Sequence, residues 1–428
     1  MSDTTISKVR GRQVWDSRGR PTVEAQVWLA GGSVGRAIAP AGASRGAHEA
    51  LDLRDGGDAS GGMGVSKAVA NINGEIAKLL MGRTAERQAE IDDALIALDG
   101  TPNKSRLGGN AMIATSMAVL HATGGAHRMP LWKYLAQGAD VELPIPEIQI
   151  FGGGAHAGRR VDVQDFMIIA LSASSFAEAL NMTADVYRAA GELMQDAGKL
   201  QGVADEGGFW PAFESNEEAL TMLTRAIERA GYAPGSQIGI SLDIAASEFG
   251  KSGRYRLGLE GRELDSDGLC EMLRNWIERY AIVSIEDPLA EDDAAGMRRF
   301  TAALGDKVQI IGDDLLVTNA ARVREAAANK TCNAVLIKPN QAGTITETRS
   351  AFMAGKSAGF GTIVSARSGE SEDVTIVHLA TGWNAGQIKV GSFSRSERMA
   401  KWNEALRIEE ALGRRARFAG RRVIPGQR

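Results

Sequence analysis

Charged residues end a series of short apolar segments in the second half of the chain, at Asp243, Glu286, Asp313, Lys338 and Lys389. The three carboxylates offer hard oxygen ligands, which favour Mg²⁺ or Mn²⁺ over zinc. A lysine that is partly desolvated near a divalent cation has a lowered pKa and can act as a general base near neutral pH. The series therefore predicts a metal site beside a base.

Plainer interpretations of these residues stay open. An acidic residue after a strand often caps the helix that follows, which would account for any one of the carboxylates. A lysine is costly at the end of an apolar strand unless it is paired or functional, so structural ion pairs with the acidic strand ends would satisfy both lysines. Three carboxylates after successive β-branched segments are better explained by a metal site.

A second group of candidate residues stands near glycines. His156 lies in Gly154-Ala-His-Ala-Gly158, Glu206 lies in Ala204-Asp-Glu-Gly-Gly208, and Asp165 stands at an expected strand end. Two neighbouring carboxylates raise the pKa of one member, which can then hold a proton for a leaving group. Taken singly, the Asp-Glu-Gly-Gly stretch also fits an ordinary turn, and His156 also fits a structural role.

A third group of residues could bind an anion. Arg367 and Ser368 precede Gly369, and Ser44 lies in a loop of small residues at 40–46. A guanidinium binds a phosphoryl or carboxylate group at two points, and hydroxyls and flexible backbone amides add further donors.

The elements that must position these residues form two domains of an α/β protein. Residues 6–40 alternate as an antiparallel meander, and helical patterns follow at 65–80, 87–98 and 110–123. These elements predict an N-terminal α+β capping domain over residues 1–135. From residue 143 to residue 428, apolar segments alternate with helical stretches and predict a parallel β/α barrel, with its chemistry at the strand C-termini.

Composition narrows the class of protein. The chain has 428 residues, a formal net charge of −4 and 44% hydrophobic residues, which fits a globular protein and argues against nucleic acid as its main partner. The first residues lack the pattern of a secretion signal, so we expect none, and no apolar run in the sequence approaches the ~20 residues that span a membrane. Two isolated cysteines, Cys270 and Cys332, indicate a reducing compartment, so we expect a cytoplasmic protein. The basic stretch 413–422 fits a solvated helix end before a frayed terminus, with an anion-binding tail as the alternative.

Several motifs resemble the enolase family, and the resemblance runs from about residue 6 to residue 412. The matching stretches are Asp16-Ser-Arg-Gly-x-Pro-Thr-Val-Glu24, Glu49-Ala-Leu-x-Leu-Arg-Asp55, Asn71-Ile-Asn73, Ser284-Ile-Glu-Asp-Pro288, Gly312-Asp-Asp-Leu-x-Val-Thr-Asn319, Arg395-Ser-Glu-Arg398 and Ile408-Glu-Glu410.

The resemblance implies a fold and an activity. It implies an enolase-type β/α barrel capped by the N-terminal domain, usually in a homodimer. The implied reaction is the Mg²⁺-dependent dehydration of 2-phosphoglycerate to phosphoenolpyruvate, with two metal sites and Mn²⁺ as a possible substitute. Enolase-superfamily sites combine a lysine or histidine base with one or two Mg²⁺ ions.

The resemblance also implies a role for each candidate residue. Asp243, Glu286 and Asp313 would bind the first metal, and Ser44 would join the second metal as its loop closes. Lys338 would remove the C2 proton, and Glu206, paired with Asp165, would help the C3 hydroxyl to leave. Lys389 would contact the substrate carboxylate, Arg367 and Ser368 would hold the phosphoryl group, and His156 would also contact substrate.

Departures from the family pattern gather around the same site. The family's Ser-His-Arg-Ser becomes Ser365-Ala-Arg-Ser368, its Gln-Glu-Phe becomes Gln164-Asp-Phe166, and its Ser-Gly-Ala-Ser-Thr becomes Ala41-Gly-Ala-Ser-Arg45. The changes remove an imidazole at Ala366 and add a cation at Arg45. They raise the alternative of a substrate with an extra anionic group, as in the carboxyphosphonoenolpyruvate synthase of phosphonate antibiotic pathways. A non-catalytic binding or scaffold protein is a third alternative.

Overall fold

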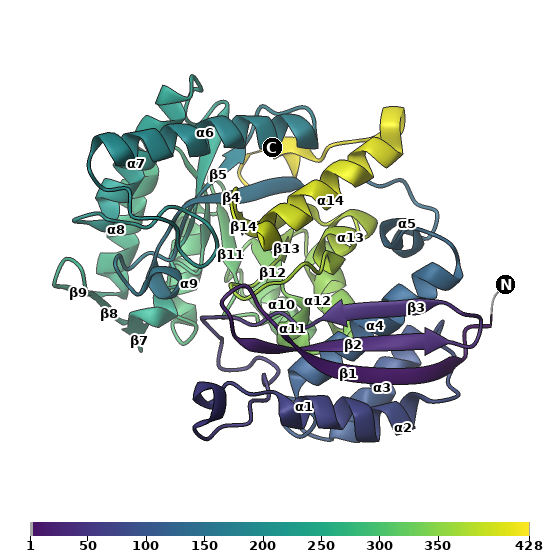
Figure 1. Cartoon of the computed structure of the whole chain (residues 1–428). Coiled ribbons are helices and arrows are strands. Elements are labelled where there is room, and N and C mark those ends of the chain that lie inside the picture. Colours follow the sequence, from purple (N-terminus) through teal and green to yellow (C-terminus); the bar gives the residue numbers. More distant parts are fainter. Residues whose placement is uncertain (1–2, 428) are drawn as a thin grey trace.

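The computed structural model describes residues 3–427, and its first domain is built on a three-stranded antiparallel sheet (Figure 1). Strands β1 (Ile6–Trp15), β2 (Pro21–Leu29) and β3 (Val34–Ile38) pair in sequence order, as the meander pattern predicts. A Cβ at Gly35 would lie 2.0 Å from the Ala118 carbonyl oxygen, so glycine lets the sheet approach the central helix of the domain.

The helices of this domain follow the predicted patterns closely. They are α1 (Ser66–Asn71), continued by a π turn (Ile72–Ile76) and α2 (Ala77–Leu80), then α3 (Gln88–Asp99), α4 (Gly109–Ala126) and α5 (Leu131–Ala136), with a 3-10 turn at Ala59–Gly62. Helix α4 is buried around most of its circumference and packs on β2 and β3. That burial matches its nearly uniform run of small and apolar side chains.

The second domain is a closed barrel of eight strands, which confirms the predicted barrel. Around the barrel the strands are β10 (Ile282–Glu286), β11 (Gln309–Gly312), β12 (Ala334–Ile337), β13 (Gly361–Ser365), β14 (Gly386–Ser392), β4 (Ile145–Gly152), β5 (Asp165–Ala170) and β6 (Ile238–Asp243). All of their side chains are buried, which explains why the strands read as continuous apolar runs.

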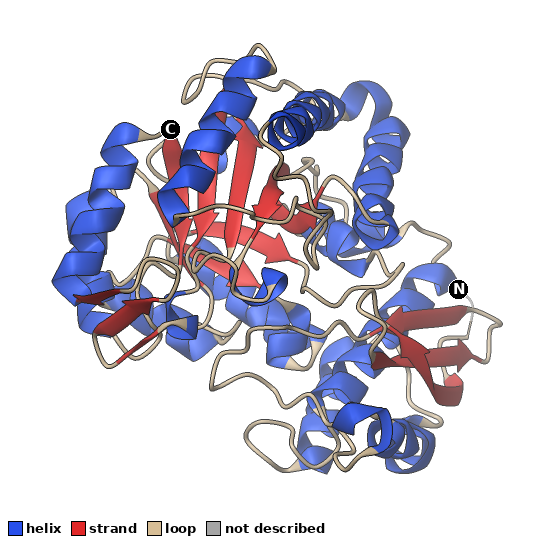
Figure 2. Ribbon diagram, turned by 60° about the vertical axis from the view of Figure 1, so that its left-hand side comes forward, coloured by secondary structure: helices blue, strands red, loops and turns tan. Residues whose placement is uncertain are grey.

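Helices surround the barrel (Figure 2). They are α6 (Phe176–Asp196), α7 (Asn216–Arg229), α8 (Ser266–Arg279), α9 (Ala294–Leu304), α10 (Ala320–Ala328), α11 (Pro339–Ala342), α12 (Ile345–Ser357), α13 (Thr375–Gly382) and α14 (Ser396–Leu412). A small sheet of β7 (Gly250–Lys251), β8 (Arg254–Leu257) and β9 (Arg262–Asp265) is inserted after β6. Short 3-10 turns occur at Gly154–Ala157, Ala246–Glu248, Gly413–Arg415 and Gly420–Val423. Among the described residues, none of the helices has both the length and the apolarity of a membrane span.

The prediction of an all-parallel barrel is wrong at one strand. Strand β5 runs antiparallel to both β4 and β6, with Asp165 paired to Asp243 and Ile169 paired to Glu147. The first crossover therefore has two strands followed by two helices, instead of one of each. Because β5 is reversed, its first residue, Asp165, lies at the same barrel end as the last residue of β6.

The expectation of a frayed terminus is also wrong within the described residues. Ile424 is fully buried against Ile145, Ile169, Leu171 and Val283 at the end of the barrel opposite to the charged strand ends. Basic residues of the tail form ion pairs with the segment that precedes β4, including Arg417 Nη2 to Asp140 Oδ2 at 3.2 Å. The tail therefore packs over the end of the barrel opposite to the charged strand ends, which we call the barrel floor.

Candidate active site

Three carboxylates from neighbouring strands meet at one end of the barrel. Glu286 ends β10 and pairs in register with Asp243, which ends β6, while Asp313 follows β11 directly. All three are buried, with exposed fractions of 0% for Glu286, 2% for Asp243 and 6% for Asp313. Strand geometry thus brings together the residues that the sequence placed after successive apolar segments.

Two lysines lie against these carboxylates. Lys389 Nζ is 2.9 Å from Asp243 Oδ2, 2.7 Å from Glu286 Oε2 and 3.4 Å from Asp165 Oδ2. Lys338 Nζ forms an ion pair with Asp313 Oδ2. Burial alone would lower the pKa of each lysine, but the adjacent carboxylates outweigh burial and raise both pKa values. This direction is opposite to the lowered lysine pKa that we expect beside a metal.

The chemistry of the three carboxylates suits a divalent cation, because each offers a hard oxygen ligand. Glu286 Oε1 is buried without a hydrogen-bond partner, and burial together with the charge of Asp243 raises the pKa of Glu286 well above its ordinary value. A cation would supply the missing partner and offset the repulsion between the carboxylates. It would also compete with Lys338 for Asp313, removing the contact that raises the lysine pKa.

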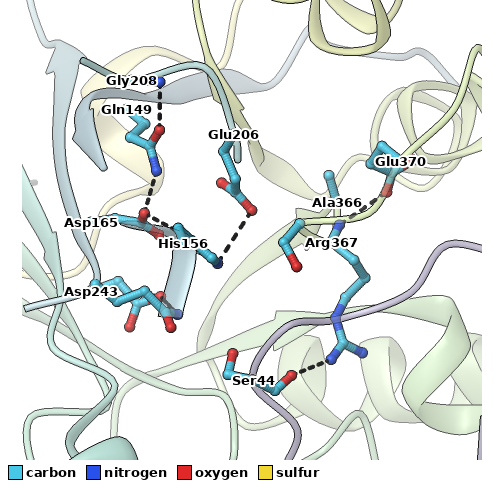
Figure 3. Close-up of polar contacts among 12 residues, drawn as sticks. Ser44, Gln149, His156, Asp165, Glu206, Gly208, Asp243, Ala366, Arg367 and Glu370 are labelled. Atoms are coloured by element: carbon cyan, nitrogen blue, oxygen red, sulfur yellow. Dashed lines mark hydrogen bonds and ion pairs between the residues drawn. The ribbon is translucent and has the colours of Figure 1, made fainter. Parts of the chain in front are cut away.

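A histidine lies between two further carboxylates on the same side of the barrel (Figure 3). His156 Nδ1 is 3.1 Å from Asp165 Oδ1, and its Nε2 is 3.7 Å from Glu206 Oε1. Burial would lower the pKa of His156, but Glu206 and Asp165 raise it to about 8. The cluster therefore holds a proton near neutral pH, next to a carboxylate that could relay it.

The candidate anion-binding arginine is engaged by the protein itself. Arg367 Nη1 donates to Glu49 Oε2 at 2.9 Å and to Asn340 Oδ1 at 3.0 Å. Its Nη2 donates to the Ser44 carbonyl oxygen at 2.9 Å and to Glu49 Oε1 at 3.2 Å. Glu49 and Ser44 belong to the N-terminal domain, so this domain closes over the barrel end through Arg367.

Buried cations support the turn that carries Arg367 and Ser368. Arg398, fully buried, donates to the carbonyl oxygens of Arg367 (2.7 Å) and Val390 (2.8 Å), and also to that of Ser368. Arg18 Nη1 donates to Ser368 Oγ at 3.1 Å, which leaves the Ser368 hydroxyl hydrogen free to donate elsewhere.

These groups enclose a small cavity. Its volume is about 20 Å³, and its lining residues are Gly42, Ala43, Ser44, His156, Gln164, Asp165, Glu206, Asp243, Lys338, Ser365, Ala366, Arg367, Ser368, Lys389 and Val390. Of the residues predicted from the sequence, Glu286 and Asp313 lie outside this lining, and so does the exposed Arg45. Ala366, the position without the family imidazole, lines the cavity.

Sequence reasoning missed several contacts at the site. Gln149 bridges two parts of the acid cluster, Glu49 holds Arg367, and Arg18 and Arg398 fix the turn after β13. Glu49, Arg18 and Arg398 lie in the motifs that carry the family resemblance, which is the signal that could have found them. Gln149 and Glu147 are polar residues in an otherwise apolar strand, and no motif marked Gln149.

A barrel with charged strand ends, lysines set among carboxylates and an N-terminal capping domain defines a class of metal-dependent lyases. Comparison with known proteins supports this class. Residues 6–135 match the family model described as the enolase N-terminal domain, and residues 140–426 match the enolase C-terminal TIM barrel domain. The chain is 51% identical to Enolase 1 of Desulfitobacterium hafniense (strain Y51) over 427 residues, covering 99% of this chain and 98% of the relative.

The chain belongs to the enolase family. It is therefore a lyase of the phosphopyruvate hydratase type. The near-complete alignment to a curated enolase does not favour the phosphonate-pathway alternative or the non-catalytic scaffold.

Proposed function

We propose that this protein dehydrates 2-phosphoglycerate to phosphoenolpyruvate with Mg²⁺. One observation carries the proposal: the cavity between the domains is lined by Lys338 and Lys389, which pair with the metal carboxylates, and by His156 and Glu206. A base for a C–H bond and an acid for a leaving hydroxyl thus face the same space.

Asp243, Glu286 and Asp313 would hold the first Mg²⁺, and Ser44 the second. A bound Mg²⁺ stabilises the negative charge that develops on the substrate carboxylate as C2 loses its proton. The unpartnered Glu286 Oε1 supports this assignment, because a bound cation would give this buried oxygen a partner that no protein donor supplies.

We assign the two proton transfers to residues on the cavity wall. Lys338 takes the C2 proton, and Glu206 delivers a proton to the departing C3 hydroxyl, which leaves as water. His156 lies between Glu206 and Asp165, and so it can replace the proton that Glu206 gives up. Both transfers need the reacting atoms within hydrogen-bond reach of these side chains.

Binding of the anionic groups falls to the other lining residues. Arg367 and Ser368 hold the phosphoryl group, and Lys389 contacts the carboxylate. A cavity of about 20 Å³ holds no more than about one water molecule, so the loop that carries Ser44 must move to admit substrate. Arg45, on the same loop, is exposed and could meet an anion that approaches the open site.

The test is the formation of phosphoenolpyruvate from 2-phosphoglycerate and Mg²⁺ by the unmodified protein, by Lys338→Ala and by Glu206→Gln. We expect turnover in the unmodified protein and a loss of at least about 100-fold in each variant. Lys330→Ala, at an exposed lysine remote from the cavity, is the control. Absence of turnover by the folded, Mg²⁺-loaded protein would refute the proposal.

We further propose a cytoplasmic homodimer, as is usual in the family. Both cysteines, Cys270 and Cys332, are free thiols, which supports a reducing compartment. Light scattering after size exclusion would measure the mass of the assembly, and a monomer at micromolar concentration would contradict the dimer.

A further inference from the structure

Gln149 connects Asp165 to the turn that carries Glu206, and these two carboxylates flank His156. It lies on β4, its side chain is fully buried, and its Oε1 accepts a hydrogen bond from the Gly208 backbone N–H at 2.8 Å. Its Nε2 donates to Asp165 Oδ1. Gly208 ends the turn that carries Glu206, so one carboxamide joins that turn to Asp165 (Figure 3).

The orientation of this amide is fixed by its partners. A backbone N–H only donates, so Gln149 must present its oxygen to Gly208, and an ionised carboxylate only accepts, so Asp165 must receive the amide nitrogen. The fit is close, because a Cβ at residue 208 would lie 2.5 Å from Gln149 Oε1. The turn therefore needs glycine at this position while Gln149 holds it.

The carboxylate that Gln149 holds also contacts His156. Asp165 Oδ1 accepts from both Gln149 and His156 Nδ1, while Asp165 Oδ2 has no hydrogen-bond partner. With Nδ1 directed at Asp165, the ring places Nε2 at 3.7 Å from Glu206 Oε1. The charged groups facing this imidazole are Asp165 on β5, Glu206 on its turn and Asp243 on β6, with Lys389 of β14 reaching Asp165.

We propose that Gln149 is a positioning residue for the proton-donating side of the reaction, because it holds Asp165 and the turn that carries Glu206 on the two sides of His156. The inference rests on the proposed function, since it deepens the role given there to Glu206. Gln149 touches no reacting atom and acts through Asp165 and Gly208.

A buried glutamine can also be purely structural, and the barrel contains an example. Gln309 and Gln387 donate to each other at 2.9 Å and 2.8 Å inside the barrel, and neither lines the active-site cavity. Gln387 is as completely buried as Gln149. Gln387→Met is therefore a matched control for the loss of buried amide hydrogen bonds.

The experiment compares Gln149→Met with Gln387→Met. Methionine keeps the length of the side chain and loses both hydrogen bonds. In Gln149→Met we expect the pKa of His156, measured by NMR titration of the metal-free protein, to shift by about one pH unit, because its carboxylate partner Asp165 loses a donor and its anchor. We also expect kcat for 2-phosphoglycerate to fall at least about tenfold while KM stays within about threefold. Gln387→Met should lose stability but change neither the pKa nor kcat.

Gln149→Glu gives a second measurement if Gln149→Met does not fold. A carboxyl keeps an acceptor for Gly208 and donates to Asp165 only when it is protonated, so its kcat should approach that of the unmodified protein as pH falls. An unchanged His156 pKa in a folded Gln149 variant would overturn the inference. Lack of turnover by the unmodified protein would instead refute the proposed function, and the NMR titration would still decide the role of Gln149.

Discussion

Arg367 and Glu49 form a two-point ion pair buried between the two domains, with Nη1–Oε2 at 2.9 Å and Nη2–Oε1 at 3.2 Å. With the bonds to Asn340 and to the Ser44 carbonyl oxygen, the four N–H groups on the terminal nitrogens of Arg367 are engaged. An anion that binds Arg367 at two points must displace one of these partners. Loop opening and access to the arginine are therefore linked.

We expect Glu49→Gln to destabilise the protein strongly. The exposed fractions of the side chains are 3% for Arg367 and 7% for Glu49, and breaking one partner of a buried pair costs about 3–5 kcal/mol. Glu75→Gln is the control, because its pair with Arg106 is exposed and should contribute at most about 1 kcal/mol. Urea unfolding measures the free energy of unfolding of both variants. Equal losses of that free energy in Glu49→Gln and Glu75→Gln would contradict the prediction.

Mg²⁺ should stabilise the folded protein through the carboxylates at the strand ends. At a concentration of about 100 Kd the gain in unfolding free energy is about 2.7 kcal/mol, and a chelator should reverse it. Glu286→Gln should abolish the gain, whereas Glu278→Gln, at an exposed helix position, should retain it. Thermal unfolding with and without Mg²⁺ makes the measurement. A full Mg²⁺ effect in Glu286→Gln would remove this residue from the metal site.

His378 should make the protein less stable in mild acid. Burial and the adjacent His121 lower the pKa of His378 to about 4, while Asp373 opposes them weakly and Glu404 lies 3.6 Å from Nε2. The ordinary pKa is about 6.5, so the unfolded chain binds the proton first and stability falls as pH drops from about 6.5 toward 4. Between pH 7 and pH 5 the loss is about 2 kcal/mol.

His378→Asn isolates that contribution. The variant should lose less stability than the unmodified protein between these pH values, whereas His127→Asn, at a partly exposed position, should behave like the unmodified protein. Urea unfolding at both pH values tests this, and identical pH dependence in His378→Asn would show that other groups are responsible.

Ala366→His should be poorly tolerated in the closed site. Ala366 has an exposed fraction of 6% and lines a cavity of about 20 Å³, so an imidazole must displace its neighbours. Overpacking of this kind costs about 1–3 kcal/mol. Ala302→His, at an exposed position of α9, is the control. A variant that keeps its stability and gains turnover would show instead that the site has room for the family histidine.

The sequence was sufficient to predict the barrel and most of the residues that lie at its charged end. Each apolar run marks a buried strand, and the charged residue after it marks the reactive end of the barrel, as at Glu286, the last residue of β10. The prediction that Lys389 ends its strand is wrong, because β14 continues to Ser392. The same logic failed at Asp165, which begins its strand. A short apolar run has the same pattern in either direction, so the local sequence does not show that a strand is reversed.

The contacts that hold the site together could not be predicted from the sequence. Gln149 is separated from Gly208 by 59 residues, and Glu49 from Arg367 by 318. Their pairing depends on where whole domains pack, which composition and periodicity do not encode. The resemblance marked Glu49 within a motif without revealing what it touches.

The buried position of Ile424 has a consequence for how the chain folds during its synthesis. The barrel floor stays open until the ribosome has made the chain out to this residue, whereas the three-stranded sheet and its helices are finished near residue 136. The capping domain can fold as it emerges, and the barrel must wait for release of its last strand and tail. Translation that stops short of residue 424 should leave an apolar opening that chaperones would recognise.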